Sequence, residues 1–237
     1  MVVGQKCIFV LKQDELGGKL KKNRQYKGIY AGGDRVSYRG FVLVPEEIMP
    51  IQKPAVKKEK APTASDYKNF SDLCFEVAIR YRDNWTSVIS GQKFKEGDWN
   101  GLQAGHGVSR QHWATRHNPL NCHAITSGEN FHMSIGTTTI IAKYWAYVAN
   151  KYGQDVVDDL INGDYHAPKL SISYLKEDCV KQYYFLYAMV TGYLIRKKIK
   201  LVEVDPDYYI KWRCEKYPKK KADGVLKVLK MITEGQI

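Results

Sequence analysis

The sequence lacks the cysteine patterns that would mark a zinc knuckle or a disulfide-stapled secreted domain. Its five cysteines stand at positions 7, 74, 122, 179 and 214, and none lies within five residues of another. This odd and widely spaced set offers neither a CxxC pair nor a disulfide framework. We therefore expect a protein of a reducing compartment, the cytoplasm.

Long apolar runs are also missing. No stretch approaches the roughly 18 uninterrupted apolar residues that a membrane span needs. The opening MVVGQKCIFV has no basic region followed by a long apolar run, so we do not expect a signal peptide. With 44% hydrophobic and 26% charged residues, the composition is that of a globular protein with no membrane partner.

Acidic residues are scarce relative to basic ones. The chain has 37 Lys and Arg against 25 Asp and Glu, a net charge of +12. Such an excess favours an anionic partner, most often nucleic acid, although basic proteins without such a partner also exist. One basic region spans 196–230, with interleaved aromatic residues, and we expect its run of Lys219, Lys220 and Lys221 to contact DNA phosphates.

The order of patterns predicts an α+β protein. Residues 1–50 carry short β-branched and aromatic runs between glycine turns, which predicts a small basic β module, a meander or a barrel. Residues 51–64, rich in Pro and Lys, predict a linker. Residues 65–165 form the second predicted domain and residues 166–237 a helical, basic C-terminal region.

Helical spacing of apolar residues predicts the elements of the helical part. The first helix is expected over 66–82 with Ser65 as its N-cap. Further helices are expected at 137–151, 154–162 and 174–198, and after Pro206 and Lys221. Strands are expected at 86–89 and 102–106. Whether the aromatic-rich helix 174–198 packs internally or forms a homodimer interface is open.

Five of the six histidines fall between positions 106 and 132. Imidazole binds metals and transfers protons near neutral pH, so this clustering indicates metal or acid–base chemistry. A strand ending at His106, a polar loop, a second strand and a helix beginning just after His132 give the outline of a ββα-metal nuclease. In such a site a histidine at the end of a strand activates water, and one divalent metal stabilises charge on the phosphate.

Three segments resemble the NinG (Rap) family of bacteriophage recombination nucleases, which are HNH-like proteins acting on branched DNA. These segments are FSDLCFEVAIRYRD at 70–83, LQAGHGVSRQHWATRHNPLNCHA at 102–124 and KYGQDVVDDL at 151–160. The resemblance covers less than half of the chain. It implies a DNA endonuclease of phage recombination, acting in the host cytoplasm.

The resemblance also implies roles for individual residues. His106 would be the general base and Asn121 would orient it. Arg110 and Arg116 would clamp DNA phosphates. The metal, one Mg²⁺ or Mn²⁺, would lie near three further residues: His123, Asn130 and His132.

Two departures from the family pattern leave two functions open. Ser87-Val-Ile-Ser90 and Thr126-Ser-Gly-Glu129 stand where the family has two cysteine pairs that bind a structural zinc, so no structural zinc is expected. The Gly-Asn before the last helix is replaced by Ile135-Gly136-Thr137. The chain is then either a zinc-free endonuclease or an inactive NinG-like fold that binds DNA or protein.

Overall fold

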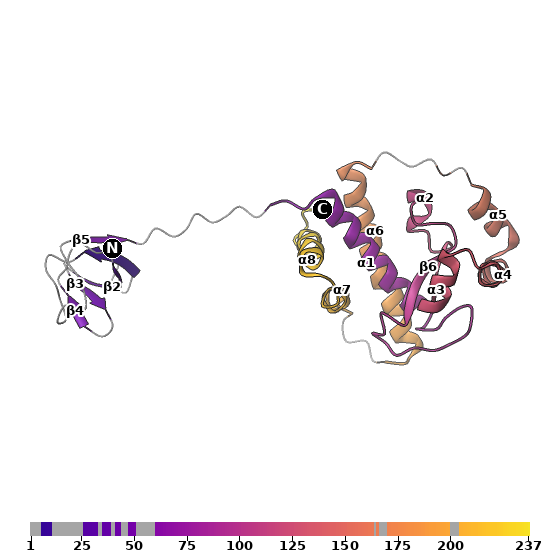
Figure 1. Ribbon diagram of the computed structural model, residues 1–237, viewed down its shortest axis with the longest axis horizontal. Coiled ribbons are helices and arrows are strands. Elements are labelled where there is room, and N and C mark those ends of the chain that lie inside the picture. The colour runs from indigo at the N-terminus through magenta and orange to yellow at the C-terminus, as the bar shows by residue number, and fades with distance from the viewer. Residues whose placement is uncertain are drawn as a thin grey trace. The chain divides into compact units, whose positions relative to one another are not determined.

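The computed structural model describes residues 60–163, 165, 170–199 and 204–237, and the backbone of five strands within the first 50 residues (Figure 1). Contacts divide the chain into two compact units, Met1–Lys60 and Ala61–Ile237. The described structure is mixed helix and strand and mostly helical, which confirms the coarse fold class predicted from the sequence. Most of the predicted linker, 51–59, lies outside the described residues.

The five strands of the first unit pair in one antiparallel sheet. They are β1 (Lys6–Val10), β2 (Tyr26–Gly32), β3 (Arg35–Tyr38), β4 (Phe41–Leu43) and β5 (Glu47–Pro50). Their order in the sheet is β4-β3-β2-β1-β5, so the first four follow a meander and β5 returns to pair with β1. Closure of this sheet into a barrel stays a prediction.

The second unit is built around α1 (Ala64–Arg82), a helix of 19 residues of which eleven are buried. Its N-cap is Thr63 and not the predicted Ser65. The Thr63 side chain accepts a hydrogen bond from the amide of Asp66, and the Asp66 carboxylate accepts one from the Thr63 amide, 2.8 Å away. This capping box stabilises the start of the helix two residues earlier than the sequence predicted.

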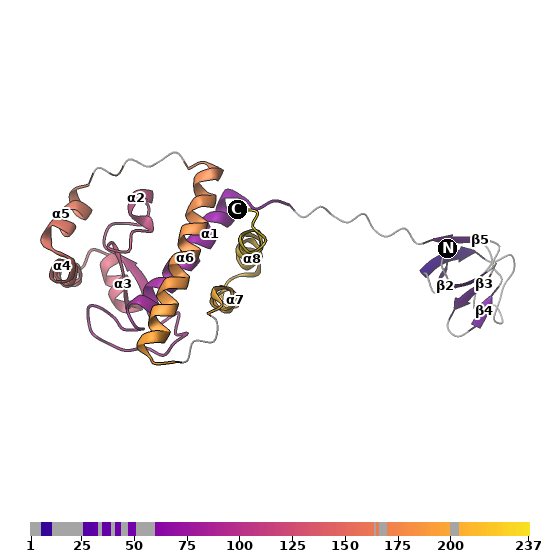
Figure 2. The same ribbon diagram turned by 180° about the vertical axis from the view of Figure 1, so that it is seen from behind.

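Three helices from the end of the chain pack on α1: α6 (Ile172–Arg196), α7 (Pro206–Cys214) and α8 (Lys219–Thr233). Figure 2 shows α6 running along α1 over most of its length. The predicted region 166–237 therefore shares one core with α1. One face of α6 is packed internally, while Tyr184 and Tyr187 on another face are exposed; a homodimer stays a prediction. Among the described residues, no helix is both long and apolar enough to cross a membrane.

An antiparallel hairpin joins β6 (Leu102–His106), at the predicted position, to β7 (Cys122–Thr126). The short α2 (Trp113–Arg116) lies in the loop between the two strands. Directly after β7 comes α3 (Ser127–Ser134), capped by Thr126 and Glu129. The sequence did not predict this helix, which its capping box starts at Ser127; the helix expected at 137–151 follows it at Thr138–Tyr152.

The predicted strand at 86–89 is also wrong. Only Thr86 forms a bridge, with Lys93. The hydroxyl of Ser87 accepts hydrogen bonds from the amides of Ile89 and Ser90, each at 3.2 Å. This side chain bends the backbone into a turn and prevents an extended strand.

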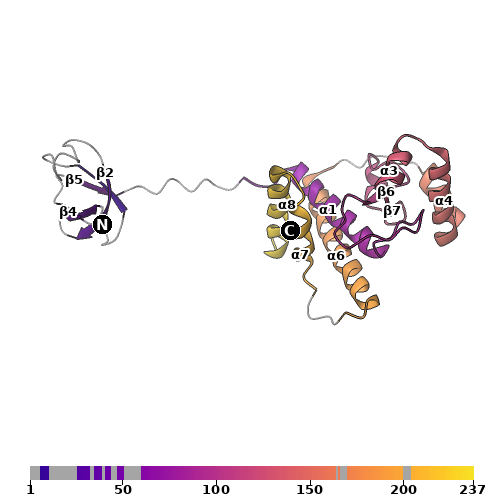
Figure 3. The same cartoon turned by 60° about the horizontal axis from the view of Figure 1, so that its bottom comes forward.

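The hairpin lies between two cores (Figure 3). Leu102, Cys122 and Ala124 belong to the core around α1. Ile125 belongs to a second core with α4 (Thr138–Tyr152) and α5 (Gln154–Asn162). Successive residues of a strand point to opposite faces, so adjacent hairpin residues contribute to different cores. His106, the last residue of β6, stands where the hairpin opens into the loop.

Candidate functional site

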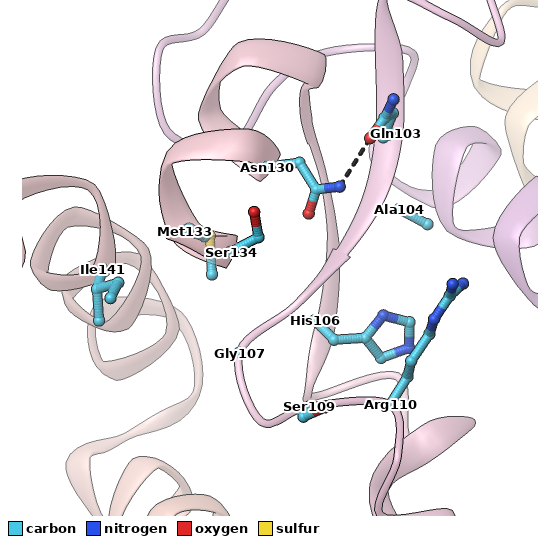
Figure 4. Close-up of a pocket in the computed structure, with 10 residues that line it drawn as sticks. All are labelled: Gln103, Ala104, His106, Gly107, Ser109, Arg110, Asn130, Met133, Ser134 and Ile141. Carbon is cyan, nitrogen blue, oxygen red and sulfur yellow. Dashed lines mark hydrogen bonds between the residues drawn. The ribbon is translucent and has the colours of Figure 1, made fainter. Parts of the chain in front are cut away.

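A cavity of about 560 Å³ opens between the end of β6, the loop that follows it and α3 (Figure 4). Its polar lining residues come from three segments close in sequence. β6 contributes Gln103 and His106, the loop contributes Ser109 and Arg110, and α3 contributes Asn130 and Ser134. Three of the predicted site residues therefore meet in one cavity: His106, Arg110 and Asn130.

The ring of His106 is held by a backbone carbonyl. Its Nε2 lies 2.9 Å from the carbonyl oxygen of Arg116. A carbonyl only accepts hydrogen bonds, so Nε2 carries the proton and Nδ1 keeps its lone pair. Burial lowers the pKa of His106 to about 4, with smaller contributions from the charges of His117, Arg110 and Arg116. His106 is therefore neutral at pH 7, with Nδ1 able to accept a proton.

The other contact of this ring is with a thiol. Cys122, opposite His106 in the hairpin, places its Sγ 3.7 Å from Nδ1. Cys122 is fully buried, and burial raises the pKa of its thiol well above the usual range. It is a weak hydrogen-bond donor at most, with no thiolate available as a nucleophile.

Asn121 was expected to orient His106, but the structure shows no hydrogen bond between these two side chains. Asn121 is fully buried, and its side chain binds the backbone of the loop instead. Its Oδ1 accepts from the amide of Val108 at 2.7 Å, and its Nδ2 donates to the carbonyls of Val108 and Thr115 at 2.9 and 3.1 Å. Asn121 thus ties the loop together, while the carbonyl of Arg116 orients His106.

The two arginines differ in environment. Arg110 is exposed and lies beside His106 in Figure 4, so it can reach an anion in the cavity. Arg116 is 6% exposed and its guanidinium contacts both carboxylate oxygens of Asp72 at 2.6 Å. It also lies over the ring of Trp113. The predicted phosphate clamp at Arg116 is wrong because this guanidinium is already paired and buried.

The structure does not gather the three residues predicted to lie near a metal. His123 is fully buried on the opposite face of the hairpin, where its Nδ1 lies 2.6 Å from Arg82 Nη2 and 3.7 Å from Asp83 Oδ2. His132 is exposed on α3 with Nδ1 near the hydroxyl of Thr137. Only Asn130 lines the cavity, so the expectation for His123 and His132 is wrong.

The donors in the cavity fit a hard cation in type but bring no charge. Asn130 and Ser134 are one helical turn apart on α3, and the Asn130 amide donates to Gln103 Oε1 at 2.7 Å. Its Oδ1 is thereby left on the side of the cavity where the Ser134 hydroxyl lies (Figure 4). Magnesium prefers oxygen ligands and retains several waters, so these two oxygens could hold it once a phosphate supplies charge. Within the described residues, no three His, Cys, Asp or Glu side chains are placed to share a metal.

A largely buried cluster of four ionisable side chains was not predicted from the sequence. His117 Nε2 lies 3.0 Å from Asp72 Oδ1, and its Nδ1 lies 3.2 Å from Asp178 Oδ1. Arg116 completes the cluster through Asp72. Burial would lower the pKa of His117, but the hydrogen bonds that its ring donates to Asp178 and Asp72 outweigh burial and raise the pKa. The stretch 70–79 holds two acidic residues, Asp72 and Glu76, and nothing in the sequence marks Asp72 as the partner of Arg116 and His117.

Four positions discussed in the sequence analysis, Ser87, Ser90, Thr126 and Glu129, come together around the Glu129 carboxylate. Ser87 donates to Glu129 Oε2 at 2.6 Å, and the amide of Thr126 donates to the same oxygen at 2.7 Å. Burial would raise the pKa of Glu129, but hydrogen bonds from Ser87, Thr126 and Ser90 lower it. A hydrogen-bonded carboxylate therefore joins the turn at 87–90 to the start of α3.

Lys219, Lys220 and Lys221 form the first turn of α8. Lys219 and Lys220 are exposed, and Lys221 lies over the ring of Tyr217 at 3.9 Å. Three cations at a helix N-terminus oppose the helix dipole, so an anion there would be favourable. Their predicted contact with DNA stays a prediction.

Comparison of the chain with protein-family models, with curated proteins and with solved structures finds no match.

Proposed function

We propose that this protein is a DNA endonuclease whose base is His106, acting in phage recombination on branched DNA. The observation that carries the proposal is the state of His106. It stands at the end of a hairpin strand, is neutral at pH 7 and has its tautomer fixed by the Arg116 carbonyl. The hairpin followed at once by α3 supports an HNH-like ββα arrangement. The NinG resemblance supports DNA as the substrate.

In the proposed reaction, Nδ1 of His106 accepts a proton from a water molecule as its oxygen attacks a phosphodiester phosphorus. The bond from this phosphorus to one deoxyribose oxygen breaks, and the leaving oxygen takes a proton from solvent. The exposed guanidinium of Arg110 donates hydrogen bonds to the non-bridging oxygens of that phosphate. Asn130 and Ser134 would hold Mg²⁺ or Mn²⁺, which when bound supplies charge stabilisation to the phosphate. The water must take the place of the long Cys122 contact at Nδ1.

A second candidate is DNA binding without hydrolysis. The specific observation in its favour is that no carboxylate lines the cavity, so a cation would find only neutral protein ligands there. In this case Arg110 and the basic first turn of α8 would bind the DNA backbone, and the fold would act as an accessory protein.

Cleavage of a supercoiled plasmid and a synthetic four-way junction separates these candidates. The assay is run with Mg²⁺, with Mn²⁺ and with EDTA, on wild type, His106→Ala and His132→Ala. Loss of the base is expected to slow metal-dependent cleavage at least about 100-fold. His132→Ala is the matched control, since this histidine is exposed on α3 outside the cavity. Wild type that binds the junction but never cuts it would favour the second candidate.

A further inference from the structure

Arg116 places two residues of the candidate site although its own side chain lies outside the cavity. Its carbonyl oxygen accepts the Nε2 proton of His106 at 2.9 Å. Its Nη1 donates to the carbonyl oxygen of Arg110 at 2.6 Å. One buried residue therefore holds both the ring of the proposed base and the backbone that presents the exposed guanidinium.

Arg116 is itself held from α1 and α6. Asp72 of α1 contacts Nε and Nη2 of its guanidinium, each at 2.6 Å. His117 bridges Asp72 to Asp178 of α6, and Gln182 donates to Asp178 at 3.1 Å. A bidentate arginine–carboxylate pair fixes orientation as well as distance. The loop thus has a defined position relative to the two longest packed helices.

We propose that Arg116 is the positioning residue of this site, held by the largely buried Asp72–His117–Asp178 cluster, and that it sets both the His106 tautomer and the reach of Arg110. The inference deepens the proposed function and rests on it for its meaning in catalysis. Lysine cannot replace this guanidinium, because a single ammonium cannot contact Asp72 through two nitrogens and also reach the Arg110 carbonyl.

The test is imidazole ¹⁵N NMR of the full-length protein with labelled histidines, the His106 signals being assigned with His106→Gln. In wild type we expect one Nε2-protonated form of His106 at neutral pH. In Arg116→Lys we expect a mixture of tautomers. Junction binding in EDTA should also show a salt slope lower by about one, the value for one lost phosphate contact. The cleavage rate should fall about 100-fold, the typical effect of a small misplacement of reacting groups.

Arg80→Lys is the matched control. Arg80, on α1, is also a buried arginine. Its Nε donates to the carbonyl of Leu102 in β6, the strand that carries His106, but its side chain has no hydrogen bond to His106 or Arg110. We expect this variant to lose stability while keeping the tautomer and the salt slope. If Arg116→Lys does not fold, Asp72→Asn replaces it, with the same changes expected.

A wild-type tautomer and salt slope in both Arg116→Lys and Asp72→Asn would overturn the inference. Both readouts are independent of cleavage. A wild type that never cuts DNA would therefore contradict the endonuclease, while an Arg116-dependent His106 tautomer would still support the positioning role.

Discussion

His106 is expected to remain a competent base far below the usual range of a histidine. Its pKa is lowered to about 4 by burial, so the ring stays neutral in mildly acidic solution. The acid limb of the cleavage rate should then fall near pH 4 and not near the ordinary value of about 6.5. A pH–rate profile on plasmid DNA, at a substrate concentration below KM, measures it. A limb near 6.5 would show that the ring is solvated in the working enzyme.

His117 should make the folded protein less stable as the pH rises. It faces Asp72, Asp178 and Arg116, and its pKa in the folded protein is raised. Its contribution to stability is therefore full below the unfolded pKa and lost as pH rises through the folded value. The free energy of unfolding, from urea titrations between about pH 6 and 9, should decline more in wild type than in His117→Gln. Equal slopes in the two proteins would contradict the charged bridge.

Three residues named from the sequence, His106, Arg110 and Asn130, line the candidate cavity, and strand geometry explains why His123 does not. His106 pairs with Cys122 in the hairpin, so the next residue, His123, points to the other face. Sequence proximity alone cannot show this, because the register between β6 and β7 depends on the loop length. The burial of Arg116 could not be predicted for another reason. Its partner Asp72 lies 44 residues away in sequence.

At the scale of elements, apolar periodicity predicted the long helices. Hydrogen bonds between side chains and the nearby backbone determine α3 and the turn at 87–90, which it did not predict. The helices 137–151 and 154–162 were predicted within a residue of α4 and α5. The whole of α3 was missed, although Thr126 and Glu129 have the spacing of a capping box. The stretch 86–89 has β-branched residues but forms a turn, because the hydroxyl of Ser87 accepts hydrogen bonds from the backbone. Strand propensity does not account for such side-chain bonds.

The start of α1 provides a prediction with its own control. Thr63→Ala removes the side chain that accepts from the Asp66 amide, and it should lower the free energy of unfolding by about 1 kcal/mol. Ser65→Ala changes a neighbouring hydroxyl of the same helix that is not the cap. Urea denaturation should show a much smaller loss for it. If Ser65→Ala lowered the free energy of unfolding more than Thr63→Ala, Ser65 would be the N-cap, as predicted from the sequence.

The polar cluster joining the turn at 87–90 to α3 should accept a metal once thiols are supplied. The combined substitutions are Ser87→Cys, Ser90→Cys, Thr126→Cys and Glu129→Cys. Two CxxC pairs at the contact between Ser87 and Glu129 match the ligand spacing of a structural zinc site. The visible absorption of tetrahedral Co²⁺-thiolate should appear on titration with Co²⁺. A three-cysteine protein that keeps Glu129 is the control, and equal spectra from both would contradict the four-ligand geometry.

For the whole molecule, charge is divided unequally between the two units. Residues 1–60 contain 13 Lys and Arg against 6 Asp and Glu, which is +7 of the total +12 and leaves +5 for residues 61–237. The second unit has its own core. The fragment 61–237 is therefore expected to fold and to bind a four-way junction with a shallower salt slope than the full chain. Equal slopes would place every DNA contact in the second unit.

The carboxylate of Glu129 also determines how a chelator experiment on this protein is interpreted. A domain cross-linked by thiolates and zinc unfolds when the ion is withdrawn, so lost activity in EDTA confounds catalysis with folding. In this chain the Ser87 hydroxyl and the Thr126 amide donate to the Glu129 carboxylate, and no structural zinc is expected there. Chelation should leave the melting curve unchanged, and any cleavage it abolishes then reports on the cavity beside His106 alone.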